Sequence, residues 1–158
     1  MASKKILRVY VDTSVVGGTF DKEFDWQTVP FWDAVRIGKI RIIVSDLLRG
    51  ELIDAPEHVR VFFNDLFNQD VEYVKLTQEA EDLAETYISE KVVSESSLDD
   101  ARHIAIATIA SADVLVSWNF KHIVNVNRIR GYNSVNLRLG HPMIDIRTPL
   151  EVMDYEEE

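Results

Sequence analysis

Short segments rich in β-branched residues alternate along this chain with longer segments of helical periodicity. The strand-like segments are residues 6–12, 40–45, 71–76, 113–118 and 143–149. Helical patterns occupy residues 27–38, 46–55, 57–69 and 77–92, and a further helix is expected to open at Ser97, with Asp100 three residues on as in a capping box. Strands that alternate with helices predict an α/β fold in which right-handed crossovers join parallel strands.

The chain is long enough for one domain with a buried core, and residues 1–150 are expected to form it. Residues 151–158 are rich in acids and are expected to be a solvated tail. The sequence has no cysteine, which excludes disulfides, thiolate zinc sites and cysteine nucleophiles. It has no run of about 18 uncharged apolar residues, so no membrane segment is expected and a cytoplasmic protein is the default prediction.

Charge is unevenly distributed along the sequence. The net charge of −10 argues weakly against nucleic acid as a partner, because contacts to phosphate require Lys and Arg. Residues 101–149, however, contain six Lys or Arg and only two acidic residues. This stretch is compatible with a basic face that binds nucleic acid, although such segregation also arises by chance.

Several oxygen-bearing side chains are predicted to lie at one edge of the sheet. Asp12 follows the first strand and Asn119 follows the fourth, while Glu51 and the pair Asp99 and Asp100 lie on helices that could flank the same edge. Folds of this type bind ligands where neighbouring parallel strands end at a switch point. Clustered carboxylates there suit a hard cation such as Mg²⁺ or Mn²⁺, because without one they repel and raise each other's pKa.

Each of these residues also has a purely structural interpretation. Asp12 could form an Asx turn, and Asn119 could simply be a turn former. Asp99 and Asp100 suit a helix N-terminus because of the helix dipole alone. Glu51 could be a solvated helix residue. The joint placement favours a site, but no single residue requires one.

Three segments resemble the PIN domain, in particular the VapC-type toxins of bacterial toxin–antitoxin pairs. They are "VYVDTSVVGG", "VSDLLRGEL" and "SLDDARHIAIATIASADVLVSWNFKHI", in the family's order and with suitable spacing. The resemblance implies a Rossmann-like, three-layer α/β/α sandwich with a central parallel sheet. It also implies a ribonuclease that uses Mg²⁺ or Mn²⁺, a small antitoxin partner and a homodimer.

The resemblance assigns roles to individual residues. Asp12, Glu51 and Asp100 match the family's metal-binding acids, and Asn119 stands where many members have a fourth acid. Ser14 occupies a position where members often have a hydroxyl near the metal. Because the amide at 119 removes a formal charge, we expect retained activity with weaker metal affinity than an all-acid site has.

Neighbouring residues are expected to support this site. Asp99 could restore the charge missing at the fourth position. Trp118 could stack on a base, although a Trp beside a strand more often belongs to the core, and His103 is expected to pack rather than to reach the site. The candidate contacts to RNA phosphate are Lys121, His122, Arg102, Arg128 and Arg130.

Two rival interpretations stay open beside the metal-dependent endoribonuclease of a toxin–antitoxin pair. One is a catalytically weak or inactive PIN domain that acts as a binding or scaffold module, which Asn119 and the acidic net charge would favour. The other is a phosphatase or nucleotide-binding enzyme on a similar sheet. The chain has neither a GxGxxG motif nor a P-loop, which argues against that third interpretation.

Overall fold

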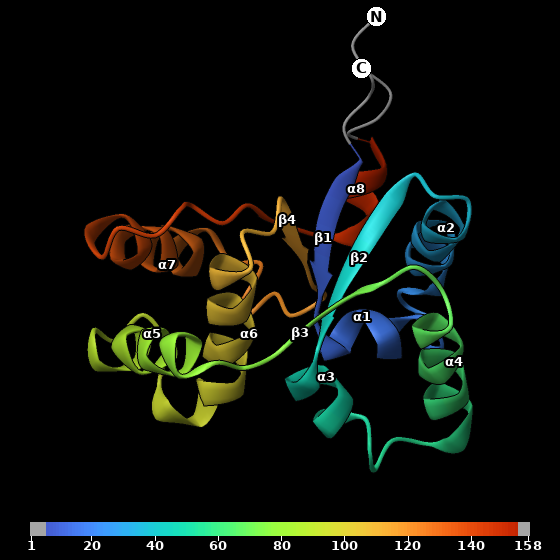
Figure 1. Ribbon diagram of the computed structural model, residues 1–158, viewed down its shortest axis with the longest axis horizontal. Coiled ribbons are helices and arrows are strands. Elements are labelled where there is room, and N and C mark those ends of the chain that lie inside the picture. The colour runs from blue at the N-terminus through green and yellow to red at the C-terminus, as the bar shows by residue number, and fades with distance from the viewer. Residues whose placement is uncertain (1–5, 155–158) are drawn as a thin grey trace, which may run out of the picture.

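The computed structural model describes residues 6–154, and within them a five-stranded parallel sheet has the order β3-β2-β1-β4-β5 (Figure 1). The strands are β1 (Leu7–Val11), β2 (Ile40–Ser45), β3 (Glu72–Val74), β4 (Val114–Val116) and β5 (Ile146–Arg147). The predicted parallel sheet is confirmed. Each strand except β2 is shorter than predicted.

Helices cover both faces of this sheet (Figure 1). On one face lie α1 (Thr13–Gly18), α2 (Asp25–Arg36), α4 (Glu57–Phe67) and α8 (Pro149–Asp154). On the other lie α5 (Gln78–Ser89), α6 (Leu98–Ile109) and α7 (Val126–Arg138). The short helix α3 (Asp46–Glu51) follows β2 directly, and a 3₁₀ turn, η1 (Glu95–Ser97), precedes α6. The three-layer α/β/α sandwich is thereby confirmed.

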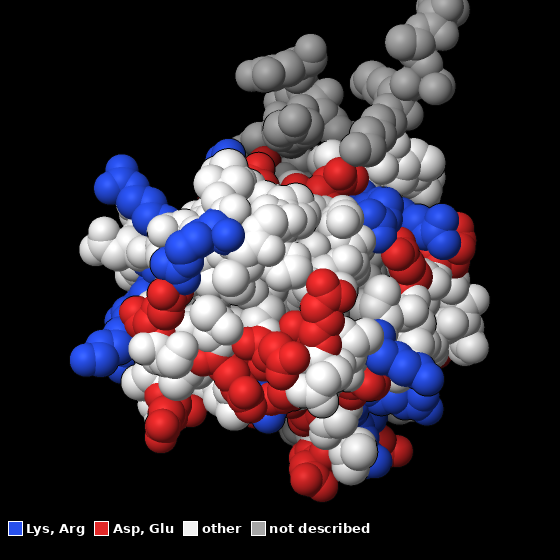
Figure 2. Space-filling view, turned by 60° about the vertical axis from the view of Figure 1, so that its left-hand side comes forward, with Lys and Arg blue, Asp and Glu red and all other residues white. Residues whose placement is uncertain are grey.

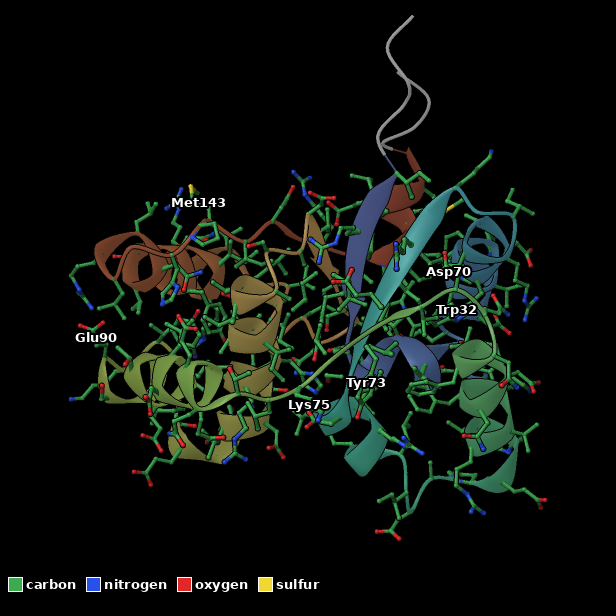
Figure 3. The ribbon with its side chains drawn as sticks, in the orientation of Figure 1. Trp32, Asp70, Tyr73, Lys75, Glu90 and Met143 are labelled. Atoms are coloured by element: carbon green, nitrogen blue, oxygen red, sulfur yellow. The ribbon has the colours of Figure 1, made fainter. Side chains whose placement is uncertain are left out.

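The alternation of side chains along β1 separates two hydrophobic cores. Val9 and Val11 belong to the core shared with α2 and α4, whereas Tyr10 belongs to the core shared with α5, α6 and α7. Trp32 illustrates the first core: Figure 3 shows it beside α1 and α4, and its ring nitrogen donates to Thr19 Oγ1 at 2.7 Å. Val9, Tyr10 and Val11 are completely buried, so both faces of the carboxyl half of β1 are covered, as in a central parallel strand.

The topological switch point of the sheet lies between β1 and β4. From β1 the chain crosses to β2 on one side, and it later returns to β4 on the other side. Val11 pairs in register with Val116, so the residues that follow them, Asp12 and Ser117, emerge at the same level of the carboxyl edge. This is the place where open α/β sheets form their ligand crevice.

Asp12 is a helix N-cap instead of an Asx-turn residue, since helix α1 begins at Thr13 and the side chain of Asp12 accepts from the N–H of Val15. Two local predictions are wrong. The helix predicted to reach Pro56 ends at Glu51, so Glu51 lies at the end of α3. Ser97 makes no side-chain capping bond, because the 3₁₀ turn before α6 places its backbone outside the extended conformation of an N-cap.

The hydrophobic pattern does not predict the two helices near the carboxyl terminus, α7 and α8. Two of the buried residues of α7 are Asn133 and Asn136; Asn133 both donates to and accepts from the backbone of Ile144. The tail predicted to start at residue 151 begins within α8, where Val152 is buried against the core, and residues 155–158 lie outside the described residues. Among the helices of residues 6–154, none is long and apolar enough to cross a membrane.

Candidate metal centre

Asp12 has a buried, immobilised carboxylate at the switch point. Only 4% of the residue is exposed. Its Oδ1 accepts from Ser14 Oγ at 2.6 Å and from the backbone N–H of Val15 at 3.3 Å, and its Oδ2 accepts from Ser117 Oγ at 2.6 Å. Ser14, which the resemblance predicts to lie near the metal, thus bonds to Asp12. Ser117 directly follows β4, so the carboxylate joins the ends of the two central strands.

Burial raises the pKa of Asp12 above its ordinary value, because the charged form loses its hydration. The nearby His103 and the hydrogen bonds from Ser117, Ser14 and Val15 act in the opposite direction and do not cancel this effect. A cation bound at this site would therefore stabilise the ionised form of Asp12.

Asp100 lies in the first turn of α6 and belongs to the same electrostatic group. Burial is the main reason why its pKa is raised, and the charge of Asp12 raises it further. His122, His103 and a hydrogen bond from Asn119 lower it. Residues far apart in the sequence thus converge on this carboxyl group, as the strand-end argument predicts for Asp12, Asp100 and Asn119.

Asn119 uses both ends of its amide within the protein. Its Oδ1 accepts from the backbone N–H groups of Lys121 at 3.2 Å and His122 at 3.0 Å. Because the oxygen faces these two donors, the NH₂ group is the end that bonds to Asp100. The residue holds a tight turn after β4 and orients Asp100, and its oxygen would have to leave the turn to ligate a cation.

Glu51 is held by a histidine. Its Oε1 lies 2.5 Å from Nε2 of His103, which is 2% exposed. The expectation that His103 only packs is wrong, because the ring is buried and also contacts Glu51. One carboxylate oxygen of Glu51 is engaged in this contact, and the side chain remains 29% exposed.

The chemistry of these residues fits a divalent cation. Asp12 and Asp100 supply hard oxygen donors whose charges oppose each other, and a bound Mg²⁺ or Mn²⁺ would remove that repulsion. The buried side-chain atoms without a hydrogen-bond partner among residues 6–154 are Thr13 Oγ1 and His122 Nδ1, from residues adjoining Asp12 and in the Asn119 turn. In the same residues, no group of three or more Asp, Glu, His or Cys side chains is arranged to hold a metal. Glu51, whose Oε1 is engaged by His103, is the remaining acid that the resemblance assigns to the cation.

The other predicted site residues divide into two sets. Arg102 binds Glu81 through Nε and Nη2 and contacts Asp99 through Nη1 at 2.9 Å, so the structure pairs Asp99 with Arg102 instead of bringing it to Asp12. Lys121 and His122 lie in the turn that Asn119 holds, with Lys121 exposed. Their role in substrate binding stays a prediction.

Sequence reasoning missed Ser117 and left two roles open for Trp118. Ser117 is completely buried and donates to Asp12; its signal is that it is the first polar residue after the apolar strand. Trp118 is 7% exposed, donates to Thr28 Oγ1 at 3.0 Å and stacks on Phe24. Trp118 is therefore a core residue and is not available for stacking on a base.

Solved structures with this fold include several VapC-type proteins. VapC20 of Mycobacterium tuberculosis, a toxin that cleaves the sarcin–ricin loop, superposes with a TM-score of 0.57 at 14% identity over 72% of this chain and 91% of that chain. VapBC2 of Rickettsia felis gives 0.58 at 14% identity over 90% and 98%. VapBC of Salmonella typhimurium gives 0.55 at 17% identity over 91% and 99%.

These similarities establish that the chain has the fold of the VapC-type PIN domains, in agreement with the sequence resemblance. No protein-family model and no curated protein sequence matches the chain. At identities of 14–17% the similarity concerns the fold, and the chemistry has to be argued from the residues of this chain.

Proposed function

We propose that this protein is a metal-dependent endoribonuclease and the toxin of a toxin–antitoxin pair. The observation that carries the proposal is the convergence of Asp12 and Asp100 at the switch point of a PIN-type sheet, where Asp12 is buried, Asp100 is half-buried and the charge of Asp12 opposes that of Asp100. Such an arrangement is costly unless a cation binds. When bound, Mg²⁺ or Mn²⁺ supplies an activated water and neutralises charge on a phosphodiester.

The residues of the chain would act around that cation. Asp12, fixed by Ser14 and Ser117, would be the most rigid ligand. Asp100 would be the second ligand, oriented by Asn119. Glu51 would be the third, directly or through a water. Fixing ligands by hydrogen bonds from their neighbours is how metal sites reach a defined geometry.

Substrate RNA is expected to approach over the Asn119 turn. Figure 2 shows that acidic side chains gather low in the centre of the face it displays, while Lys and Arg lie mainly toward its margins. The acids of α5 would repel phosphate. Lys121, exposed beside the site, is the cation best placed for a phosphate contact.

An antitoxin and a second copy of this chain are the partners that the proposal implies. The solved VapBC complexes contain a toxin together with its antitoxin, one of them bound to a promoter fragment. Cleavage of the sarcin–ricin loop belongs to VapC20 and is not part of the proposal for this chain. A cytoplasmic location stays a prediction from the sequence.

Cleavage of RNA by wild type and by Asp12→Asn tests the proposal. With Mn²⁺ present, wild type should cut single-stranded or looped RNA, and Asp12→Asn should lose at least about a hundredfold in rate, because it removes the charge of the most rigid ligand. Asp33→Asn, at an exposed carboxylate of α2, is the matched control and should cut like wild type. Wild type that neither cuts RNA nor inhibits growth would contradict the proposal.

One observation favours the alternative of a binding module. Among residues 6–154 no group of three carboxylate or imidazole ligands is preassembled, and the oxygen of Asn119 is already engaged. A module of this kind would bind RNA or a protein partner without cutting, and Asp12→Asn would leave that binding unchanged.

A further inference from the structure

A line of hydrogen bonds runs through the buried interior to Glu51. It begins at Ser45, the last residue of β2, whose Oγ lies 2.8 Å from the hydroxyl of Tyr10 in β1. The same hydroxyl lies 2.6 Å from Nδ1 of His103 in α6, and Nε2 of His103 lies 2.5 Å from Oε1 of Glu51 in α3. Ser45, Tyr10 and His103 are each at most 2% exposed. We call these three residues the relay.

When Glu51 is ionised and His103 is neutral, only one direction of donation satisfies the relay. If His103 carried its single proton on Nδ1, its Nε2 would point a lone pair at the carboxylate of Glu51 at 2.5 Å. With the proton on Nε2, His103 donates to Glu51, and Nδ1 must accept from the O–H of Tyr10. The hydroxyl of Ser45 then donates to Tyr10, while its oxygen accepts from the backbone N–H of Leu48 at 3.1 Å.

Burial of Tyr10 is compatible with this direction. The residue is completely buried, and burial raises the pKa of its hydroxyl, so that it keeps its proton. Tyr10 can therefore donate to Nδ1 of His103 at 2.6 Å. No water is needed to fix the tautomer, since every polar atom of the line has a protein partner.

We propose that the relay of Ser45, Tyr10 and His103 positions the carboxylate of Glu51 by fixing His103 as an Nε2–H donor to Glu51 Oε1. One oxygen of Glu51 is thereby anchored and the other is left for a cation or a metal-bound water. The inference rests on the proposed function in one respect, namely that Glu51 is taken as a ligand. The residues of the relay touch no substrate and are positioning residues.

Tyr10→Phe is the variant that opens the relay while keeping the ring. Its matched control is Tyr87→Phe: Tyr87 is also completely buried, lies in the same hydrophobic core and bonds to Asn136, without contact to the relay. Each variant removes one buried hydroxyl, which bonds to Ser45 and His103 in Tyr10 and to Asn136 in Tyr87, so both variants should have a lower melting temperature than wild type. A purely structural role for Tyr10 would make the two variants alike in every other measurement.

The first measurement is the ¹⁵N spectrum of the His103 ring at neutral pH, which distinguishes the two tautomers without metal or RNA. We expect Nε2–H in wild type and in Tyr87→Phe, and a mixture of tautomers in Tyr10→Phe. A ring that carries its proton on Nδ1 or on both nitrogens in wild type overturns the proposal. So does a ring whose spectrum is unchanged in Tyr10→Phe.

The second measurement is a calorimetric titration of the full chain with Mn²⁺ alone. Tyr10→Phe should bind Mn²⁺ about tenfold or more weakly than wild type, as is usual when a partner of a metal ligand is lost, whereas Tyr87→Phe should bind like wild type. Equal affinities of Tyr10→Phe and wild type overturn the positioning of a ligand.

A second pair of variants tests the same donor if Tyr10→Phe fails to fold. His103→Gln keeps an N–H donor near the position of Nε2 and should retain most of the affinity, whereas His103→Leu should lose it. If His103→Gln and His103→Leu bind alike, the donor to Glu51 has no role. If wild type binds no Mn²⁺, the proposed function fails, and the tautomer of His103 still decides whether the relay exists.

Discussion

At the scale of single residues, the structure gives Asn119 a different role from the one that its sequence position predicts. In the sequence it stands where an acid is expected, so it predicts a site of reduced charge. In the structure its oxygen accepts from the turn and its NH₂ group donates to Asp100. An aspartate at this position would keep the bonds to the turn but would face Asp100 with a second negative charge.

Asn119→Asp should therefore have opposite effects without and with metal. Without metal, the lost donor and the added repulsion should lower the free energy of unfolding by about 1–2 kcal/mol. With Mn²⁺, the extra charge should tighten binding, so the rise in melting temperature with Mn²⁺ should be steeper than in wild type. Thermal melts with and without Mn²⁺ measure both. An unchanged Mn²⁺ affinity would defeat the charge argument.

Asp100→Asn should stabilise the metal-free protein in a pH-dependent way. Since the pKa of Asp100 is raised on folding, the folded chain binds more protons than the unfolded chain at pH values just above the ordinary value of 3.8. Its contribution to stability therefore falls as pH rises through that window. The variant should be more stable than wild type at pH 7, and this advantage should vanish as pH falls to the ordinary value.

Chemical denaturation of both proteins across this pH range, with chelator present, checks the sign. Asp33→Asn, at an exposed carboxylate, should follow wild type throughout. If Asp100→Asn is more stable than wild type by the same amount at every pH, the gain is caused neither by relief of repulsion from the charge of Asp12 nor by loss of hydration of the Asp100 carboxylate.

At the scale of elements, a close contact fixes the end of α1 against the segment that follows β4. A Cβ atom on Gly18 would lie 2.7 Å from Cδ1 and 2.8 Å from Nε1 of Trp118, whose ring nitrogen is bonded to Thr28. The backbone N–H of Trp118 in turn donates to Ser14 Oγ, which bonds to Asp12. The packing of two elements is thus connected to the geometry of the site.

Gly18→Ala should lower the free energy of unfolding by about 1–3 kcal/mol, since the rigid ring of Trp118 has to move. Gly17→Ala is the control in the same helix, because a Cβ there meets nothing within 4 Å. It should be neutral or slightly stabilising, as usual for Ala in place of a helical Gly. Equal melting temperatures of the two variants would show that the contact with Trp118 relaxes without cost.

Some helices and strands can be predicted from local sequence patterns and others cannot. The strands and the helices with apolar faces follow from the sequence, because their buried positions recur with period 2 or 3.6. Helix α7 does not, since Asn133 and Asn136 are buried through hydrogen bonds that an apolar pattern ignores. Helix α1 does not either, because the same Asp12 signal is compatible with a turn and with an N-cap.

At the scale of the whole molecule, the topology explains which site residues could be predicted. Asp12 and Asn119 follow the two central strands, so their approach is a consequence of strand order. The contact of Glu51 with His103 joins residues 52 positions apart and depends on how the end of α3 lies beside the middle of α6. Only the three-dimensional packing reveals it.

The central claim at the scale of the whole molecule is that Asp12, Asp100 and Glu51 together hold one divalent cation. A crystal grown with Mn²⁺ and measured at a wavelength where manganese scatters anomalously tests it most directly. We expect one strong anomalous peak between Asp12 and Asp100, at ligand distance from both carboxylates, with Glu51 reached directly or through one water. A well-ordered site with no anomalous peak, or a peak bound by other residues alone, would contradict the account.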